Sequence, residues 1–391
     1  MIGLEEALAI VAGHLIRKGS EVVSLESAAG KVLAEDVVAD RDAPPFSRAT
    51  MDGYACRRED LPGPLLMLET IPAGKIPARS LAKGQCSKIM TGAMVPEGAD
   101  CVIMKEFVTI DQEGKILYTA SGTDTNIHPR GQDLQKGEPI LHEGTRLSAP
   151  HIGMIASAGK MQVRVSRTLY VGILATGSEL IDPEHQPQGA QVRNSNSHQL
   201  EALIREAGHT PVNLGIAEDQ RDILAERISE GIDHTDLLLI TGGASVGELD
   251  LVPGTLKELG FRLEFSRVAM QPGKPVTFAH RSEQVVFGLS GNPVSSFVQF
   301  EMLVRPYLEQ CTGALPLNRR IRLKMAAGYR RKHADRMFFL PVSFTGEGNC
   351  EPVPYHGSGH LHALAGAAGF AEMAPGQTEI QQGDQVDVRL I

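Results

Sequence analysis

LYVGILATGSEL, residues 169–180, opens the most regular part of the chain. Apolar runs rich in Val, Ile and Leu alternate from here with segments of helical spacing. The runs predict strands at residues 169–176, 210–216, 236–243, 262–270 and 284–290, and the segments between them predict helices at 196–207, 219–230, 250–259 and 293–311. Because the strands lack polar alternation, helices are expected on both faces of a parallel sheet. Residues 168–312 are therefore predicted to form a doubly wound α/β domain, and the short connection before its last strand allows one antiparallel pairing.

The remaining residues predict a multidomain chain of the α/β plus β class. Leu4, Leu8 and Val11 recur at helical spacing, and the segment after Pro150 repeats that pattern. We expect these two helices to pack together, as a discontinuous helical linker domain of residues 1–20 and 140–167. Short β-prone runs separated by Gly and Pro predict an inserted β-rich domain at 21–139 and a C-terminal β domain at 313–391. The inserted runs are 22–25, 65–69, 87–89, 102–108 and 116–118, and the C-terminal ones are 321–327, 336–344, 370–375 and 385–391.

Composition excludes several classes of protein. The chain has 391 residues and a formal net charge of -9, which argues against non-specific nucleic-acid binding because that needs a basic surface. Trp is absent, so little is available for stacking on bases. Five scattered cysteines, with no closely spaced pair, favour a reducing cytoplasm. The acidic start of the chain does not resemble a signal peptide, and no run of about 18 apolar residues predicts a membrane span.

Three glycine-bearing loops follow strands that should end at one edge of the sheet. They are ATGSE (175–179), TGGASVGELD (241–250) and SGNPVSS (290–296). Open α/β sheets bind ligands at this edge, and glycines let backbone N–H groups approach a phosphate. One such loop alone is better explained as an ordinary turn, but three together favour a ligand site. The residues expected to bind the ligand here are Thr176, Gly177, Gly242, Gly243, Ser245, Gly247, Gly291, Asn292, Pro293 and Ser295.

Three carboxylates, Glu179, Asp219 and Asp250, each fall just after a predicted strand or at the start of the helix behind it. Carboxylates beside a phosphate site repel the ligand unless a cation lies between them, and Mg²⁺ prefers oxygen ligands. The alternative is helix capping, since Asp219 and Asp250 stand at the starts of predicted helices. We predict that all three bind Mg²⁺.

Other polar segments carry weaker signals. QPGKP (271–275) fixes a tight loop in which Lys274 can meet an oxyanion, or can be an ordinary surface lysine. The basic run 330–336 is either an electrostatic lip for an anionic ligand or a solvated hairpin tip. The cluster of His356, His360 and His362 has no carboxylate or cysteine at ligand spacing, so zinc is not expected there. Two segments of the insertion, 44–55 and 89–100, are predicted only to be structured loops.

Six motifs in series carry a resemblance that covers essentially the whole chain. MDGYA (51–55), IMTGAMVPEGAD (89–100), ATGSEL (175–180), ITGGASVGELD (240–250), QPGKP (271–275) and SGNPVSSF (290–297) occur in this order. Together they resemble the molybdopterin molybdenumtransferase family, of the MoeA and gephyrin E-domain type. The resemblance implies that molybdenum from molybdate is inserted into adenylylated molybdopterin, with Mg²⁺-dependent release of AMP. It also implies a homodimer with shared active sites and contact with the adenylyltransferase of the same pathway.

The resemblance also assigns roles to residues. Asp52, Thr91, Asp250 and Lys274 would be catalytic. Arg267, Lys274, Pro293, Arg336 and Ser358 would line the side of the pterin and molybdate. Gln271 stands where the family often has Lys, which removes one positive charge from the expected oxyanion contacts, and Ser290 replaces a frequent Pro.

Two other functions compete with this one. A molybdopterin adenylyltransferase or nucleotide pyrophosphatase could share the α/β loops but would not need MDGYA or IMTGAMVPEGAD, and a tungsten-selective transferase has no distinguishing sequence feature. A non-enzymatic scaffold is disfavoured because all three carboxylates are present.

Overall fold

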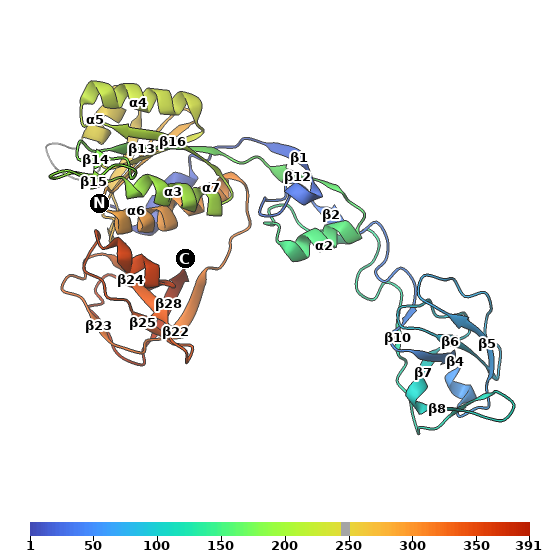
Figure 1. Cartoon of the computed structure of the whole chain (residues 1–391). Helices are drawn as coiled ribbons and strands as arrows, with labels where there is room; N and C mark the ends of the chain where they lie inside the picture. Colours follow the sequence, from blue (N-terminus) through green and yellow to red (C-terminus); the bar gives the residue numbers. More distant parts are fainter. Residues whose placement is uncertain (244–250) are drawn as a thin grey trace. The chain divides into compact units, whose positions relative to one another are not determined.

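A computed structural model describes residues 1–243 and 251–391, and these form two compact units (Figure 1). The first unit contains residues Met1–Glu35, Gly144–Ser148 and Val163–Ile391. The second contains Asp36–Glu143 and Ala149–Gln162.

The first unit contains most of the helices and two six-stranded sheets. Its helices are α1 (Leu4–Ala12), η1 (Leu25–Ser27), α3 (Ser195–Glu206), α4 (Arg221–His234), α5 (Leu251–Glu258), α6 (Pro293–Gln299), the π-helical η4 (Phe300–Val304), α7 (Arg305–Cys311) and η5 (Leu361–Gly366). Its strands are β1 (Ser20–Ser24), β12 (Gln162–Ser166), β13 (Tyr170–Thr176), β14 (Leu180–Ile181), β15 (Val192–Arg193), β16 (Thr210–Ala217), β17 (Leu237–Thr241), β18 (Arg262–Arg267), β19 (Met270–Gln271), β20 (Pro275–Arg281), β21 (Gln284–Leu289), β22 (Arg320–Lys324), β23 (Tyr329–Arg330), β24 (Met337–Phe344), β25 (Cys350–Pro352), β26 (Gly369–Met373), β27 (Glu379–Ile380) and β28 (Gln385–Leu390).

The α/β sheet confirms the doubly wound prediction. Its strand order is β16-β13-β17-β21-β20-β18, with the first four strands parallel and the last two antiparallel to their neighbours. The predicted strand 262–270 was too long: β18 ends at Arg267, and β20 was missed altogether. β20 was not predicted because the prolines of QPGKP indicate a turn. The strand in fact begins at the second of these prolines, Pro275, which pairs with Arg267 of β18.

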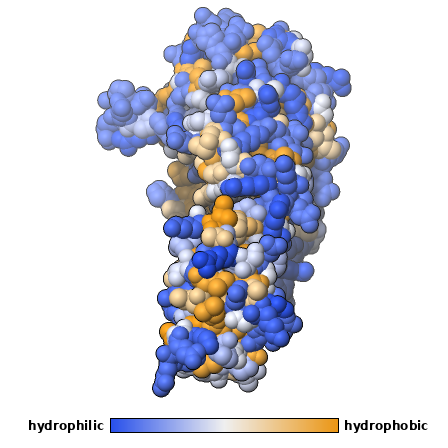
Figure 2. All heavy atoms as spheres, turned by 90° about the vertical axis from the view of Figure 1, so that its right-hand side faces the viewer, coloured by the Kyte–Doolittle hydropathy of each residue, from blue (hydrophilic) through white to orange (hydrophobic). Residues whose placement is uncertain are grey.

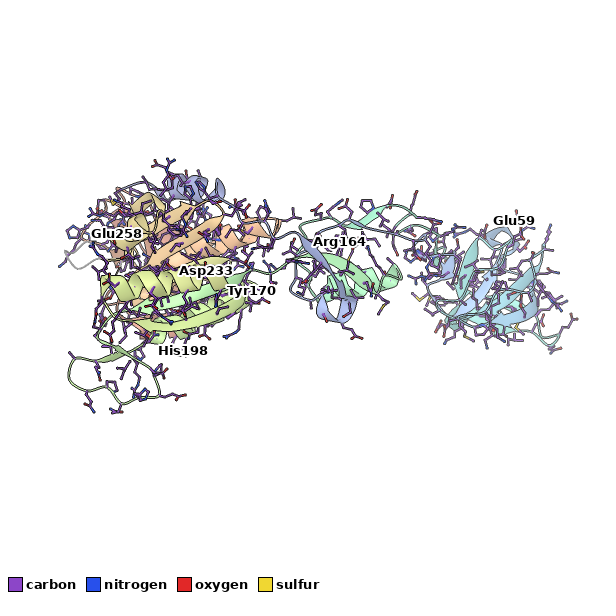
Figure 3. All side chains as sticks on the ribbon, turned by 90° about the horizontal axis from the view of Figure 1, so that it is seen from above. Glu59, Arg164, Tyr170, His198, Asp233 and Glu258 are labelled. Carbon is purple, nitrogen blue, oxygen red and sulfur yellow. The ribbon has the colours of Figure 1, made fainter. Side chains whose placement is uncertain are left out.

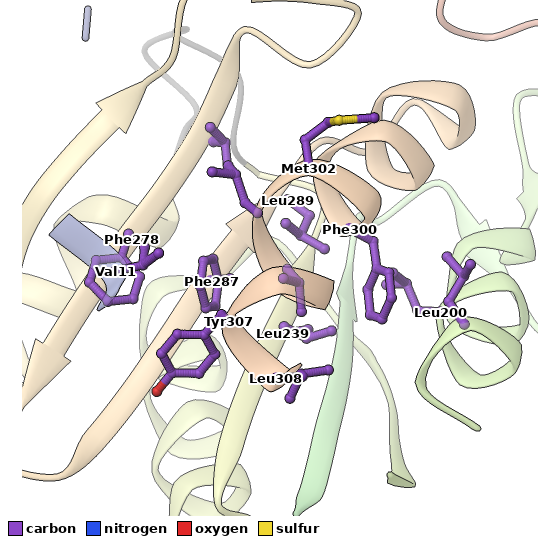
Figure 4. Close-up of a cluster of buried hydrophobic side chains, with 14 of the residues drawn as sticks. Val11, Leu200, Leu239, Phe278, Phe287, Leu289, Phe300, Met302, Tyr307 and Leu308 are labelled. Atoms are coloured by element: carbon purple, nitrogen blue, oxygen red, sulfur yellow. The ribbon is translucent and has the colours of Figure 1, made fainter. Parts of the chain in front are cut away.

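Helices cover both faces of this sheet, as Figure 1 shows. Leu224 and Ile228 of α4 pack on one face together with Leu256 of α5. Side chains of α1, α3, α6 and α7 pack on the other face, around Phe278, Phe287 and Tyr307 (Figure 4). These three aromatic rings are fully buried, with centroids 4.9 Å apart for the Phe pair and 5.5 Å apart for Phe287 and Tyr307. Truncating a buried aromatic of this kind to Ala costs about 3–5 kcal/mol.

The prediction that the first helix packs against the segment after Pro150 is wrong. Ala7 and Val11 of α1 are fully buried in the α/β core, and α1 contacts α7. Helical spacing shows that a helix has an apolar face but does not show which surface covers it. The segment before the insertion does contact the segment after it, but through paired strands and not through helices: β1 pairs with β12.

The C-terminal residues of the first unit form a β-sheet of order β19-β24-β26-β28-β22, and β25 also pairs with β24. The four strands predicted here are confirmed, and β25 was missed. The sheet also takes β19 from the α/β region: Met270 and Gln271 pair in parallel with Met337 and Phe338. The C-terminal sheet therefore includes a strand, β19, that comes before the predicted domain boundary at residue 313.

The second unit is β-rich, as predicted, but begins at Asp36 and includes the later helix. Its elements are β2 (Val37–Val38), β3 (Arg48–Ala49), β4 (Gly53–Cys56), η2 (Arg58–Asp60), β5 (Leu66–Ile71), β6 (Gln85–Ile89), β7 (Cys101–Met104), η3 (Lys105–Phe107), β8 (Val108–Ile110), β9 (Ile116–Tyr118), β10 (Ile127–His128), β11 (Pro139–Leu141) and α2 (Ala149–Ser157). The main sheet has the order β5-β6-β4-β7.

MDGYA is not the loop that composition indicated, because its last residues form the buried inner strand β4. A Cβ on Gly53 would lie 1.9 Å from the carbonyl oxygen of Ile103, so no larger residue fits there without a shift of β7. Cys56 pairs with Cys86 and Cys101 on its two sides. All five cysteines are free and buried, as expected for reduced thiols.

Hydrophilic residues predominate on the face in Figure 2, with smaller hydrophobic patches between them. Within residues 1–243 and 251–391, no helix combines the length and the apolar character that a membrane span requires.

Candidate functional site

A crevice of about 650 Å³ opens at the carboxyl ends of β13, β17 and β21. Figure 3 labels Tyr170, the first residue of β13, at the opposite edge of the sheet. The residues that line the crevice are Thr176, Gly177, Glu179, Leu180, Val192, Arg193, Asn194, Ser195, Asn196, Asp219, Thr241, Gly242, Gly243, Pro275, Ser290, Gly291, Asn292, Pro293 and Gly359. The structure thus brings the described parts of all three predicted glycine loops together. Ser245, Gly247 and Asp250 lie outside the described residues.

Glycine is required at position 242, where the loop after β17 touches the end of β13. Gly242 has a φ of +101°, and a Cβ there would lie 2.0 Å from the carbonyl oxygen of Thr176. Gly291 also lies close to Gly242: a Cβ on Gly291 would be 3.5 Å from the Gly242 Cα. At Gly242 only backbone fits, whereas a Cβ at Gly291 would make an ordinary van der Waals contact. With glycine at both positions, the polar main-chain groups can face a ligand without side chains in the way.

Asp219 is held at the crevice by the first loop. Its carboxylate accepts hydrogen bonds from Thr176 Oγ1 at 2.6 Å and from the backbone N–H of Ser178 at 3.3 Å. The capping alternative is not supported, because α4 begins at Arg221 and its N-cap is Gln220. Asp219 is therefore held in place by the end of β13 and the loop after it, and it does not cap α4.

The Glu179 carboxylate lies over Gly177. A Cβ on that glycine would be 2.8 Å from Glu179 Oε2 and 2.9 Å from Oε1. Both Glu179 and Asp219 are exposed, so water or a ligand can reach their oxygens. The described residues thus place two carboxylates beside the glycine loops.

Asn196 was not predicted as a site residue, although it lines the crevice and is buried. Its Nδ2 donates to Thr241 Oγ1 and to the Gly291 carbonyl, both at 2.9 Å, which joins the loops after β17 and β21. Asn194 caps α3 by accepting from the N–H of Ser197 at 3.2 Å. The run NSNS (194–197) indicated a helix start, and only the fold shows that this start lies at the crevice.

Gln299, at the end of α6, was also missed. It is fully buried, and its Oε1 accepts from the N–H of Ser290 at 2.7 Å. Its Nε2 donates to the carbonyls of Gly273 at 2.9 Å and Pro275 at 2.6 Å. One side chain therefore joins the loop after β21 to the QPGKP loop. No sequence signal marked it, since a glutamine inside an apolar helix has many possible partners.

Several predicted residues lie outside the crevice lining. Arg267 ends β18, paired with Pro275, and Lys274 precedes Pro275. Ser295 is buried in α6. The carbonyl of Ser358 accepts from the N–H of Val294 at 3.1 Å, which places the following residue, Gly359, at the crevice.

The basic run 330–336 is not a simple solvated hairpin tip. Arg331 is buried and donates to the carbonyls of Gln377 at 2.7 Å, Arg336 at 2.8 Å and Ala374 at 2.6 Å. It fixes the loop from which Arg336 projects, and Arg336 itself pairs with Asp335 at 3.3 Å. Arg336 does not line the crevice in the described structure.

In the second unit, two of the predicted site residues, Asp52 and Thr91, contact each other. The Thr91 N–H and Oγ1 both donate to Asp52 Oδ1 at 2.9 Å, and Lys105 Nζ lies 3.1 Å from Oδ2. The hydrogen bonds from Thr91, then that from Lys105, lower the pKa of Asp52 to about 2. Asp52 is therefore a fixed, ionised carboxylate, and Lys105 is a partner that the sequence did not indicate.

Comparisons with known proteins cover the same regions. The family models described as "MoeA N-terminal region (domain I and II)", "Probable molybdopterin binding domain" and "MoeA C-terminal region (domain IV)" match residues 2–159, 172–310 and 322–391. A molybdopterin molybdenumtransferase of Bacillus subtilis is 33% identical over 100% of this chain and 94% of its own. The chain belongs to the molybdopterin molybdenumtransferase family. It is thus a transferase of molybdenum cofactor biosynthesis, as the motifs predicted.

Other relatives agree with this family over the full length. The molybdopterin molybdenumtransferase of a Synechocystis strain is 32% identical over 98% of both chains. A crystal structure of the molybdopterin biosynthesis MoeA protein from Pyrococcus horikoshii OT3 has a TM-score of 0.86 and 29% identity over 100% of both chains. The multidomain fold is therefore that of the molybdopterin molybdenumtransferases, and not that of a free-standing α/β module.

Proposed function

We propose that the protein inserts molybdenum from molybdate into adenylylated molybdopterin, with Mg²⁺-dependent release of AMP. The observation that carries this proposal is the crevice in which three glycine loops, the start of α3 and two carboxylates meet. Glycine loops and a helix N-terminus favour phosphate oxygens, and carboxylates at the same place favour a bridging cation.

The loops supply the part of the site that holds the phosphoanhydride. Gly242 and Gly291 leave their main chain open to the crevice, and Asn196 fixes the two loops relative to each other through its paired hydrogen bonds. Donors that are fixed before the ligand binds need no reorganisation as charge develops during the reaction. The attacking groups can belong to the pterin and the oxyanion, so the chain need not supply a nucleophile.

Glu179 and Asp219 have the donor chemistry for Mg²⁺. Both present carboxylate oxygens at an exposed position, and Mg²⁺ typically uses one or two protein carboxylates together with waters and substrate phosphates. When bound, Mg²⁺ would offset the negative charge of the phosphoanhydride and of the departing AMP. Thr176 and Ser178 keep Asp219 oriented for this role. We expect Asp250 to be the third carboxylate.

The remaining roles are proposed from the resemblance of the sequence motifs to those of the family. Lys274, Arg267, Arg336 and Ser358 are proposed for the pterin and molybdate. Asp52 and Thr91 are proposed as the inserted domain's contribution in a homodimer with shared active sites. We also propose that the transferase acts in the cytoplasm and receives its substrate by contact with the adenylyltransferase.

The decisive experiment incubates the purified protein with adenylylated molybdopterin, Mg²⁺ and either molybdate or tungstate, and measures AMP by chromatography. We expect AMP release that requires both Mg²⁺ and an oxyanion. Asp219→Asn should lower the rate about 100-fold, because one oriented metal ligand is lost. The matched control is Asp222→Asn, an exposed carboxylate on the first turn of α4, which should keep the wild-type rate.

Two results would overturn the proposal. Absence of AMP with either oxyanion would favour a binding role. Formation of adenylylated molybdopterin from ATP and molybdopterin, with release of pyrophosphate, would instead identify an adenylyltransferase. The ratio of the rates with molybdate and with tungstate shows whether the enzyme is selective for molybdenum or for tungsten.

A further inference from the structure

Three potential metal ligands gather on the first unit, and none of them lines the crevice. His14, Glu264 and His280 each offer one nitrogen or oxygen atom, and these atoms all lie within 4.8 Å of one another. In the described residues this is the one group of three or more such side chains that converges so closely. The cluster of His356, His360 and His362, which the sequence made conspicuous, does not converge in this way.

The three residues come from distant parts of the sequence but from firmly placed elements. Glu264 lies on the edge strand β18, and His280 lies on the neighbouring β20. His14 follows α1, where its N–H donates to Val11 and its carbonyl accepts from Tyr307 Oη at 2.9 Å. The backbones that carry the ligands are therefore held by the core of the unit.

The present geometry is close to a coordination shell. His280 Nε2 and Glu264 Oε1 are 3.1 Å apart, and the His14 and His280 rings are stacked with centroids 3.8 Å apart and planes 28° apart. Tetrahedral zinc with bonds of about 2.1 Å places its ligand atoms about 3.4 Å from one another. The separation of 3.1 Å between the His280 and Glu264 atoms is close to this value. The imidazoles must tilt out of their stack so that both lone pairs point to one centre.

We propose that His14, Glu264 and His280 bind a divalent transition-metal ion of the Zn²⁺ class. Two imidazoles and one carboxylate form a ligand set that suits zinc and its neighbours better than Mg²⁺, which prefers oxygen alone. Three protein ligands leave a coordination position for water.

Among the described residues, Arg262 is the cation that competes for this carboxylate, and it is weakly held. Arg262 Nε lies 2.8 Å from Glu264 Oε1, but the Arg262 side chain is 77% exposed. An ion pair with such an exposed partner contributes little, so a metal ion can displace the guanidinium. The side chains of Glu264 and His280 are each 17% exposed, which leaves an entry path and still limits competition by water.

A metal at this position would join the end of α1 to the free edge of the α/β sheet. β18 is the last strand of that sheet, and α1 is the element whose partner the sequence did not reveal. The role that we assign to the metal is to hold these two elements together, at a place outside the transferase crevice.

The test is a Zn²⁺ titration of the chelator-treated full chain, with excess Mg²⁺ to occupy oxygen sites and a chromogenic chelator as competitor. We expect one tight equivalent in the wild type and at least a tenfold loss of affinity in His280→Ala and in His14→Gln. His198→Ala, an exposed histidine on α3 (Figure 3), is the matched control and should bind as the wild type does. Co²⁺ should give visible d–d absorption that disappears in the same two variants.

Thermal unfolding provides a second readout. Zn²⁺ should raise the Tm of the wild type and of His198→Ala, but not that of His280→Ala or His14→Gln. Circular dichroism in chelator checks that each variant is folded. Equal zinc affinity in the wild type and both ligand variants would overturn the proposal, as would loss of the tight equivalent in His360→Ala instead.

Discussion

Replacement of Gln299 by Leu tests how the crevice is assembled. The side chain is fully buried and makes three hydrogen bonds to main-chain groups, one as acceptor from Ser290 and two as donor to Gly273 and Pro275. Leucine has nearly the same volume but no polar atoms. The substitution therefore leaves one N–H and two carbonyl groups without partners and creates only a small packing change.

The expected cost follows from the number of orphaned groups. A buried polar group without a partner costs about 1–3 kcal/mol, so three cost about 3 kcal/mol even at the lower limit. This is a large fraction of the 5–15 kcal/mol that typically stabilises a domain. The cost is local, because the three groups belong to the loop after β21 and the QPGKP loop.

Amide hydrogen exchange measures this effect at the residue concerned. The Ser290 N–H donates to Gln299 in the wild type, and its exchange should become about 100-fold faster in Gln299→Leu, since 1.4 kcal/mol corresponds to a factor of ten. AMP release should fall in parallel. The matched control is Gln382→Leu, an exposed glutamine between β27 and β28, which should change neither quantity. Unchanged exchange at Ser290 in Gln299→Leu would refute the idea that this side chain holds the loops together.

Three further predictions concern single sites. Gly242→Ala should abolish AMP release and lower the Tm, because its Cβ would lie 2.0 Å from the Thr176 carbonyl oxygen at a φ of +101°; a fully active variant would contradict this. Thr91→Val should raise the pKa of Asp52 from about 2 toward 3.8, as one of its hydrogen bonds is lost, and NMR titration of the carboxyl measures this. The Thr91 contribution to stability is present above pH 3.8 and is lost as the pH falls toward 2. His209 is buried, and this burial is the main cause that lowers its pKa from 6.5 to about 4. Between these two pH values the unfolded chain therefore binds one proton more than the folded chain. The free energy of unfolding should fall by about 3 kcal/mol as the pH drops through that window, and His209→Gln should lose this part of the pH dependence of the Tm.

Local patterns were sufficient for the four parallel strands of the α/β sheet. Runs such as LLLIT in β17 are buried on both faces, so their sequences are apolar throughout and identify themselves. β20 and β4 were missed for a different reason. Each stands beside turn residues, and its strand conformation depends on pairing with two neighbours, which are β18 and β21 for β20 and β6 and β7 for β4.

The π-helical segment Phe300–Val304 was likewise not visible in the predicted helix 293–311. Pro306 follows it closely and has no N–H to donate to the carbonyl four residues before, which explains why the regular ladder is interrupted nearby. Pro306 can be read from the sequence, but its effect on the helix depends on how the surrounding core accommodates it.

The sequence by itself determined the class of the protein, its family and the three loops that carry glycines and carboxylates, because these depend on periodicity and on contiguous motifs. Tertiary structure alone decided that α1 joins the α/β core, that Asn196 and Gln299 fix the crevice loops, and that His14, Glu264 and His280 meet. The physical reason is the same in each case. A hydrogen bond or a coordination site needs partners at a few ångströms, and residues 250 positions apart acquire that proximity only when the sheet and its covering helices have been assembled.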